Sequence, residues 1–333
     1  MLHTLVLGLG RAGSGLHLRV LAKARATAPD LFHPEPVIGC DPVADTRHDL
    51  HDVITAASLD VATKLVNPQR TVVHVCTPPT TRVAVLTQLA QHGFRRAIVE
   101  KPLATGVGEL REIDALRQRY GLDLVVVSHW MAAELTERIE QLVRHGELGE
   151  LRSIRFTQDK PRFTRSAATH GHPTAFDVEL PHSLGVVLQL AGPAEVQRAA
   201  WTDMRCPDAV LPRMGSAHLT LHHAGGVTSE ISSDLTSPVQ QRRIVLEFTG
   251  GQVTGHYPIS DQDDHAQLVV DGQRHIFRDD ALTRFVLRAY RHFRTPSAGG
   301  HPTLQVHRDV VRLLAEAKQR CALAAERSSS HAR

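Results

Sequence analysis

The sequence has little of several residue types that mark whole classes of protein. It holds four cysteines, Cys40, Cys76, Cys206 and Cys321, and no two of them have C-x-x-C spacing. This disfavours a disulfide scaffold and a zinc site, so we expect no metal and a reducing, cytoplasmic environment. No apolar run approaches the ~20 residues of a membrane span. The segment 1–8 has no basic stretch of the kind that opens a secretory signal, and we expect neither membrane nor secretion.

An excess of one charge is also missing. The 333 residues include 38 basic and 35 acidic side chains, and the basic ones form no long run. This balance argues against a nucleic-acid partner. Only five basic residues are lysines, so each can be examined singly, whereas 22 histidines make a lone histidine weak evidence for a ligand. The length predicts two domains, and a 42% apolar content is typical of soluble globular proteins.

The first part of the chain alternates between short apolar runs and helical patterns. The runs are continuously apolar, as in strands whose sheet is covered on both faces. Strands that alternate with helices predict an α/β Rossmann domain with a doubly wound parallel sheet over residues 1–127. The expected strands lie at 2–7, 36–40, 71–76, 97–100 and 122–127.

The pattern changes after residue 127. An amphipathic helix at 132–145 precedes segments of alternating polarity, separated by hairpin-type turns at 223–226 and 271–272. This predicts an α+β second domain over 128–325 with a large, mostly antiparallel open sheet. Two more helices are expected at 281–293 and 303–325, followed by a frayed polar tail at 326–333.

A glycine motif directly follows the first strand and opens a helix, which is the context of a dinucleotide site. In Gly8-Leu-Gly-Arg-Ala-Gly13, Gly8 permits a tight turn and Gly10 lets a pyrophosphate approach the backbone. Gly13 lets the helix and the strand pack closely, and the amides of the helix start attract phosphates. The alternative is an ordinary glycine turn in an α/β fold.

Asp41 ends the second strand, where an acid can accept hydrogen bonds from the adenosine ribose. The same carboxylate would repel a 2′-phosphate, so NAD is favoured over NADP. Arg47 and the other arginines of this loop keep NADP open. A helix N-cap is the structural alternative for Asp41.

Two later motifs complete a recognisable order. Thr77-Pro78-Pro79 follows a strand, and Glu100-Lys101-Pro102 follows the next one. With the glycine motif and Asp41, they resemble the Gfo/Idh/MocA oxidoreductase family, and the resemblance extends over nearly the whole chain. It implies an NAD(P)-dependent dehydrogenase or reductase that acts on a ring carbon of a sugar, amino sugar or cyclitol. The cofactor-binding residues that it implies are Gly8, Gly10, Arg11, Ala12, Gly13, Asp41, Cys76, Thr77, Pro78, Glu100 and Lys101.

The resemblance also implies catalytic roles. Lys101 matches a family lysine near the nicotinamide and the reacting hydroxyl, where an ammonium stabilises a developing alkoxide. A surface lysine in a turn is the alternative, and a cis Pro102 would help to aim the side chain. His182 matches the histidine of an Asp-x-x-x-His motif and is the expected general acid or base.

The sequence departs from the family pattern beside that histidine. Val178 stands where the family has aspartate, and Asp177 and Glu179 flank it. We expect Glu179 to orient His182 or contact substrate, and Asp177 is a further candidate. The alternative is that Asp177 only caps a helix and His182 is one histidine among many.

Other departures concern the substrate pocket. Arg82 stands where relatives often have histidine, and His129-Trp130 where Asn or Arg is frequent. We expect His129 and Trp130 to line the pocket with Lys101 and His182, although Trp130 could equally be a core aromatic. The resemblance implies a homodimer or homotetramer through the second-domain sheet. Redox-assisted glycoside hydrolysis and a non-catalytic dinucleotide sensor remain alternative functions.

Overall fold

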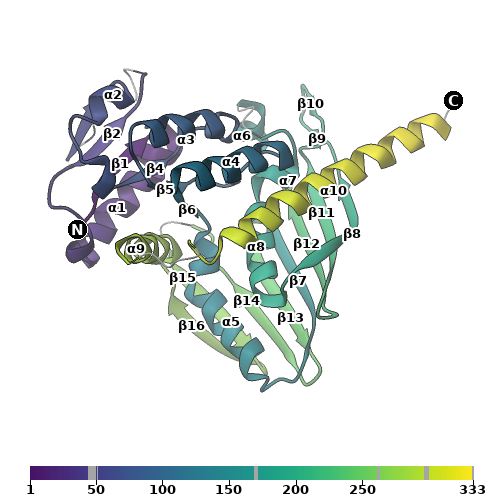
Figure 1. The fold of residues 1–333 in the computed structure, drawn as a ribbon. Helices are drawn as coiled ribbons and strands as arrows, with labels where there is room; N and C mark the ends of the chain where they lie inside the picture. Colours follow the sequence, from purple (N-terminus) through teal and green to yellow (C-terminus); the bar gives the residue numbers. More distant parts are fainter. Residues whose placement is uncertain (44–49, 51, 169–171, 261–262, 296–299, 332–333) are drawn as a thin grey trace. The chain divides into compact units, whose positions relative to one another are not determined.

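The computed structural model describes residues 1–43, 50, 52–168, 172–260, 263–295 and 300–331 (Figure 1). The chain divides into two compact units. Unit 1 consists of Met1–His129 and Leu282–Val311, and unit 2 consists of Trp130–Ala281 and Arg312–Arg333. The chain therefore enters each unit twice.

Unit 1 is built on a six-stranded sheet in the order β3-β2-β1-β4-β5-β6, and every neighbouring pair is parallel. The doubly wound parallel sheet expected from the sequence is therefore confirmed. The strand order reverses between β1 and β4, and ligands of such sheets bind outside the carboxyl ends of the strands at this point. The strands are β1 (His3–Leu7), β2 (Val37–Cys40), β3 (Val53–Ala56), β4 (Thr71–Val75), β5 (Arg96–Val99) and β6 (Asp123–Val126).

Helices accompany the strands of this sheet in chain order. Their apolar sides contribute Leu86, Leu89, Leu110 and Ile113 to a core that continues into the buried strands. Glycine at position 121, in the left-handed conformation, ends the longest of them. The helical elements are η1 (Gly13–Leu18), α1 (Arg19–Thr27), η2 (Pro29–Leu31), α2 (Leu59–Ala62), η4 (Pro68–Arg70), η5 (Pro79–Thr81), α3 (Arg82–Gln91) and α4 (Val107–Tyr120).

A late helix belongs to unit 1, although the sequence alone placed it in the second domain. This helix is α9 (Ala281–Arg294), and its buried face includes Tyr290. The Tyr290 hydroxyl lies 2.6 Å from Thr4 Oγ1, and its ring contacts Phe32 at a centroid distance of 4.2 Å. These contacts are formed between residues more than 250 positions apart, so local patterning gives no sign of them.

Unit 2 is built on an eight-stranded sheet in the order β16-β15-β14-β13-β7-β12-β11-β8. Its neighbouring pairs are antiparallel except for β7 and β12, so the mostly antiparallel sheet is confirmed. The turns expected at 223–226 and 271–272 join antiparallel neighbours. The strands are β7 (Leu151–Asp159), β8 (Ala194–Trp201), β11 (Ser216–His223), β12 (Thr228–Asp234), β13 (Gln241–Phe248), β14 (Gln252–His256), β15 (His265–Val270) and β16 (Gln273–Arg278), beside the short pair β9 (Met204–Arg205) and β10 (Val210–Leu211).

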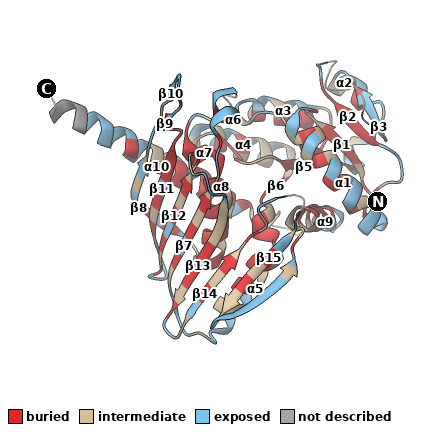
Figure 2. Cartoon of the chain, turned by 180° about the vertical axis from the view of Figure 1, so that it is seen from behind, coloured by how far each residue is buried: buried red, intermediate tan, exposed pale blue. Residues whose placement is uncertain are grey.

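One face of this sheet packs against helices and the other is open. Side chains along β11 alternate, with Leu219 and Leu221 buried and His218 and His222 exposed. Figure 2 shows buried and exposed residues alternating along the strands. The helices of unit 2 are η6 (His129–Ala132, whose first residue closes unit 1), α5 (Glu134–His145), α6 (Phe163–Ala168), α7 (Ala175–Val178) and α8 (Leu180–Ala191).

The C-terminal helix is longer than the sequence predicted. α10 (Leu304–His331) continues through residues 326–331, where a frayed tail was expected. Ala324, Ala325, Glu326 and Arg327 are good helix formers, so the helix continues from the preceding turn into this stretch. Within the described ranges, no helix combines the length and the apolar character that crossing a bilayer requires.

Candidate cofactor and catalytic sites

The glycine turn after β1 is packed so tightly that two of its positions require glycine. Gly8 has φ +92°, in the left-handed region, and a Cβ at Gly13 would lie 1.9 Å from the carbonyl oxygen of Gly8. At Gly10, by contrast, a Cβ would meet no atom of the described residues within 4 Å. The turn thus leaves backbone open at Gly10, as the approach of a pyrophosphate requires.

Asp41 holds this turn from the end of β2. Its Oδ2 accepts a hydrogen bond from Leu9 N at 2.7 Å, and its Oδ1 accepts one from Val43 N at 2.9 Å. Each carboxylate oxygen can accept more than one hydrogen bond, so Asp41 can also receive a ribose hydroxyl. Arg47, the residue that kept NADP open, lies outside the described residues.

The ends of β4 and β5 bring further predicted cofactor residues to the same edge of the sheet. Cys76 N donates to Leu7 O at 2.8 Å, and Glu100 N donates to Val75 O at 3.1 Å. A Cβ at Gly8 would lie 3.1 Å from Thr77 N, so the two turns are in contact. Thr77 Oγ1 is buried and has no hydrogen-bond partner among the residues that the structure describes.

Of the remaining predicted cofactor residues, Gly10, Arg11 and Pro78 are exposed and Ala12 is half-buried. Lys101 follows Glu100 directly and is also half-buried. The Lys101–Pro102 peptide bond is cis, as the sequence analysis anticipated. The structure therefore gathers the predicted residues of unit 1 at the carboxyl edge of β1, β2, β4 and β5.

A buried hydrogen-bond chain reaches Glu100 from inside unit 1. Glu100 Oε1 lies 2.9 Å from His17 Nε2, and His17 Nδ1 lies 2.8 Å from His74 Nδ1. His74 Nε2 then lies 3.1 Å from the hydroxyl of Tyr290, which contacts Thr4 Oγ1. Sequence reasoning missed this chain, because a helix, two strands and a distant helix each contribute one or two members.

The charges in this chain are set by burial and by the partners. Burial opposes a charge on His17, but the facing Cys76 sulfur and the Glu100 carboxylate raise the pKa of His17 to about 10. Burial also opposes ionisation of Glu100, yet the His17 contact holds the pKa of Glu100 below its ordinary value. Burial and the neighbouring His17 charge lower the pKa of His74, so His74 is neutral.

Arg82 is a second residue that the motifs did not identify as functional. Its side chain is fully buried, and Nη1 donates to the carbonyl oxygen of Glu100 at 2.6 Å. Its Nε and Nη2 have no hydrogen-bond partner in the described part of the chain. Burial lowers the pKa of Arg82 to about 10, so the guanidinium stays charged at neutral pH.

Unit 2 places His182 beside an aromatic stack. The ring of Trp130 lies 5.4 Å from that of His182, 5.0 Å from Tyr257 and 5.6 Å from Phe156. The Arg242 guanidinium lies 5.5 Å from the Trp130 centroid, within the range of a cation–π contact. Trp130 is buried, so it is a core aromatic and at the same time a wall against which His182 packs.

The two acids flanking Val178 are used differently. Asp177 Oδ2 accepts from Thr174 N and Thr174 Oγ1 in a capping box at the start of α7, and Asp177 Oδ1 accepts from Lys318 Nζ at 2.8 Å. Glu179 is buried and bonds Lys160 and the amide of Gln158.

Lys160 and Gln158 were not identified as functional by the sequence motifs. Burial lowers the pKa of Lys160, whose partner Glu179 opposes that effect. Gln158 Oε1 has no hydrogen-bond partner within the described ranges. Alternation along β7 could have placed Gln158 on the inward face with Phe156, but polar residues at such positions carry no distinctive signal.

Residues 2–129 match the model of the oxidoreductase family with an NAD-binding Rossmann fold. A comparison with curated proteins finds no match.

Solved structures resemble the chain over almost its full length. A putative NADPH-dependent oxidoreductase from Desulfitobacterium hafniense has a TM-score of 0.78 and 15% identity, covering 95% of each chain. UDP-N-acetylglucosamine 3-dehydrogenase GnnA from Acidithiobacillus ferrooxidans has a TM-score of 0.70 and 19% identity, covering 97% of this chain and 98% of its own. A variant of a 3-ketoreductase from Actinomadura kijaniata, in complex with TDP-benzene and NADP, has a TM-score of 0.72 and 14% identity, covering 96% of each chain. At these identities the likeness shows a shared fold.

Proposed function

We propose a specific hydride-transfer reaction for this chain, because residues 2–129 match the model of the Gfo/Idh/MocA oxidoreductase family with its NAD-binding Rossmann fold. In it, hydride passes between the nicotinamide and a ring carbon of a sugar, amino sugar or cyclitol. The main observation that supports this reaction is that the glycine turn and the Glu100–Lys101 segment lie at the same carboxyl edge of one sheet. Two proteins of similar fold, described as a 3-dehydrogenase of a nucleotide sugar and a 3-ketoreductase, support the substrate class.

The residues at this edge fit a dinucleotide. Gly8, Gly10 and Gly13 would admit the pyrophosphate, and the first turn of the following helix would offer amide donors to it. Asp41 would accept the ribose hydroxyls and disfavour a 2′-phosphate, which makes NAD the preferred cofactor. Thr77 Oγ1 is a buried donor without a partner among the described residues, and it would gain one from the bound cofactor.

Lys101 and His182 carry the chemistry in this proposal. The nicotinamide supplies or accepts the hydride when it is bound. The Lys101 ammonium stabilises negative charge on the substrate oxygen, and His182 takes up or gives the hydroxyl proton. The tilted contact with the Trp130 ring limits the orientations of the His182 ring. We propose that His129 and Glu179 contact substrate, whereas Asp177 supports the site by capping α7.

Binding and turnover measurements test this function. Purified protein is titrated with NADH and NADPH and then assayed on polyols, cyclitols and amino sugars, free and nucleotide-linked. We expect tighter NADH binding, and turnover that falls about 10²–10³-fold in Lys101→Ala and in His182→Ala, because each loses a group acting in the transition state. Lys64→Ala, an exposed lysine of unit 1, is the matched control.

Three outcomes would contradict the proposal. Absence of binding to either cofactor would remove its basis. Full activity in Lys101→Ala would exclude the assigned charge stabilisation. Glycoside cleavage with recycling of tightly held NAD would favour the redox-assisted hydrolase instead.

A further inference from the structure

Four elements of unit 1 meet in the buried chain that ends on Glu100. β1 contributes Thr4, η1 contributes His17, β4 contributes His74 and α9 contributes Tyr290. All four side chains are at most 2% exposed. We propose that this chain holds His17 as an imidazolium and makes His17, His74 and Tyr290 positioning residues for Glu100 and Lys101. The role of Lys101 rests on the proposed function, but the charge of His17 does not.

Donor and acceptor rules allow only two states of the chain. A carboxylate only accepts, so His17 Nε2 must carry a proton toward Glu100. The two Nδ1 atoms face each other at 2.8 Å, so one of them carries a proton and the other does not. If His17 Nδ1 is the donor, His17 is an imidazolium. If His74 Nδ1 is the donor, His17 is neutral.

The hydrogen bonds of His74, Tyr290 and Thr4 depend on which of the two Nδ1 atoms carries the proton. With His17 charged, His74 accepts at Nδ1, donates from Nε2 to Tyr290, and Tyr290 donates to Thr4. With His17 neutral, every one of these donors reverses, so the two states differ by one proton and by the direction of the whole chain. A hydroxyl at position 290 is needed in either state, because His74 Nε2 is 3.1 Å from it.

The surrounding charges favour the imidazolium. His17 faces the Glu100 carboxylate and the Cys76 sulfur, and Arg82 and Lys101 act on Glu100 from other elements. A neutral His17 would leave the buried carboxylate with a weaker hydrogen bond, which is costly in a low-dielectric interior. The raised pKa of His17 agrees with the geometry.

The hydrogen-bond chain from Thr4 to Glu100 would fix the position of the segment that carries Lys101. His17 holds the Glu100 carboxylate at 2.9 Å, and Arg82 holds the carbonyl of the same residue at 2.6 Å. Lys101 is attached to that carbonyl by one peptide bond. If His17 were neutral, the Glu100 carboxylate would face no positive charge at this contact. The carboxylate would then attract the Lys101 ammonium.

The charge of His17 can be measured directly by imidazole ¹⁵N NMR on the full chain. We expect both ring nitrogens of His17 to be protonated at pH 7.5. Tyr290→Phe leaves a buried His74 Nε2–H without an acceptor in the charged state but only an unused lone pair in the neutral state, so His17 should lose its proton at least tenfold more readily. Tyr257→Phe is the matched control, because it removes a buried hydroxyl bonded to Thr136 in unit 2. A neutral His17 in the wild type, or an equal shift in both variants, overturns the assigned charge.

The effect on Lys101 has a readout that needs no turnover. With five lysines in the sequence, ¹³C reductive methylation yields a sparse NMR spectrum, and Lys101→Arg assigns the signal. We expect His17→Gln to raise the titration midpoint of Lys101 and to leave that of Lys160 unchanged. An unchanged Lys101 midpoint overturns the positioning role even if the protein proves to be the proposed dehydrogenase, whereas a shift supports it even if no substrate is found.

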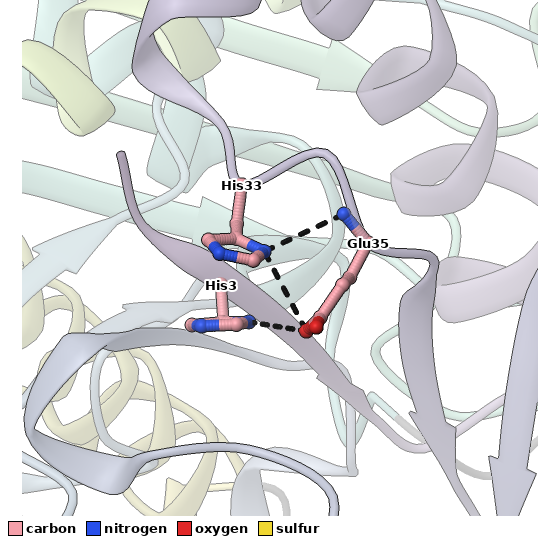
Figure 3. Close-up of side chains that lie close together, drawn as sticks. All are labelled: His3, His33 and Glu35. Carbon is pink, nitrogen blue, oxygen red and sulfur yellow. Dashed lines mark hydrogen bonds and ion pairs between the residues drawn. The ribbon is translucent and has the colours of Figure 1, made fainter.

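An independent observation lies at the opposite, amino-terminal ends of β1 and β2. His3 Nδ1 and His33 Nδ1 lie 3.3 Å and 3.5 Å from the same Glu35 oxygen. Figure 3 shows the two stacked rings turning these nitrogens toward the carboxylate. Ligand atoms on a tetrahedral zinc ion are about 3.3–3.5 Å apart, given bonds of about 2.0–2.2 Å. We propose that His3, His33 and Glu35 bind a divalent transition metal such as Zn²⁺.

The backbone around these residues is already fixed. Leu2 and the segment after η2 are joined by hydrogen bonds from Leu2 N to Leu31 O and from His33 N to Leu2 O. Arg25 donates to the carbonyl oxygens of Pro34 and Glu35. His33 Nδ1 accepts a long hydrogen bond from Glu35 N at 3.4 Å, which a metal ion bound at this nitrogen would replace.

The probes are Zn²⁺ for thermal shift and Co²⁺ for its absorption spectrum. We expect Zn²⁺ to raise the melting temperature of the wild type, and His3→Asn, His33→Asn and Glu35→Gln each to weaken binding at least tenfold. His265→Asn is the control, since it alters the other described histidine–acid cluster. Equal metal responses in the wild type and all three variants, or loss of the response in His265→Asn, overturn the site.

Discussion

Glu100 is held by more of its neighbours than any motif would suggest. Its carboxylate contacts His17, its carbonyl accepts from Arg82, and its amide donates to Val75. A buried ion pair stabilises little in net terms, but removing one partner leaves a desolvated charge that costs about 3–5 kcal/mol. The pair is therefore a sensitive probe of this region.

The stabilisation by this pair should depend on pH at both ends. His17 has a folded pKa above its ordinary 6.5, so its contribution is complete below pH 6.5 and disappears as the pH rises to about 10. Glu100 has a lowered pKa, so its contribution is complete above 4.5 and disappears in acid. Urea unfolding of wild type and His17→Gln should differ most between pH 4.5 and 6.5. A difference independent of pH would contradict the ion pair.

Two glycines of η1, Gly13 and Gly15, should respond in opposite ways to substitution by alanine. Gly13→Ala places a Cβ 1.9 Å from the Gly8 carbonyl oxygen, so we expect marked destabilisation and loss of NADH binding. Gly15→Ala meets no described atom within 4 Å and should stabilise the helix by about 0.5–1 kcal/mol. Thermal unfolding and NADH titration measure both effects. Normal NADH binding by Gly13→Ala would show that the turn is not the cofactor site.

The residues that sequence could identify are those whose role is local. The glycines, Asp41 and Glu100-Lys101 follow strands directly, so their placement at one edge of a parallel sheet follows from chain order. His17 and His74 lie far apart in sequence and were two among 22 histidines. Their contact depends on how η1 lies on β4, which no spacing encodes.

The start of α8 shows how an element can be secured by its neighbours. α7 begins with the Thr174–Asp177 capping box, and the Asp177 carboxylate also bonds Lys318 of α10. Both carboxylate oxygens of Asp177 thus accept hydrogen bonds. Asp177 lies five residues before His182 in the sequence. Asp177 therefore supports the site by holding α7 and α10 in place.

A pair of substitutions separates this supporting role from catalysis. Asp177→Ala should lower the free energy of unfolding by about 1–3 kcal/mol, because it loses a cap and a charged hydrogen bond. Asp177→Asn keeps an acceptor and should retain kcat within about threefold, unlike a general base, whose loss costs about 10²-fold or more. Urea denaturation and steady-state kinetics measure the two. A collapse of kcat in Asp177→Asn with unchanged stability would make Asp177 a catalytic residue.

Strands made of buried apolar residues were predictable, and strands with many exposed residues were not. β1, β2, β4, β5 and β6 are apolar runs, and the sequence analysis found all of them. It missed β3, β8, β14 and β16, together with the two-residue strands β9 and β10. β3 and β16 are edge strands with many exposed residues, so burial imposes no strong pattern on them. β14 contains a glycine that fits against Ile244 and Leu135, which weakens the strand signal.

The open face of the unit 2 sheet bears on the assembly of the whole molecule. Arg155 of β7 and Glu230 of β12 form an ion pair on it, and each side chain is 60% exposed. An exposed sheet face of this size offers a surface to a second copy of the chain, and we predict a dimer or tetramer through it. Light scattering should show the oligomer, and Arg155→Glu should weaken it by like-charge repulsion. A monomer at micromolar concentration would contradict this.

The return of α9 to unit 1 has a consequence for biosynthesis. Tyr290 completes the buried chain that includes Thr4 and His74, yet roughly 160 residues separate it from the end of the N-terminal segment of that unit. At about 5–20 residues per second, the ribosome needs on the order of 10–30 s to synthesise them. During this time the strands of unit 1 lack the side chains that α9 adds to their core. They are therefore accessible to chaperones and proteases. A nascent chain truncated before α9 should therefore be degraded quickly, although its glycine motif is complete.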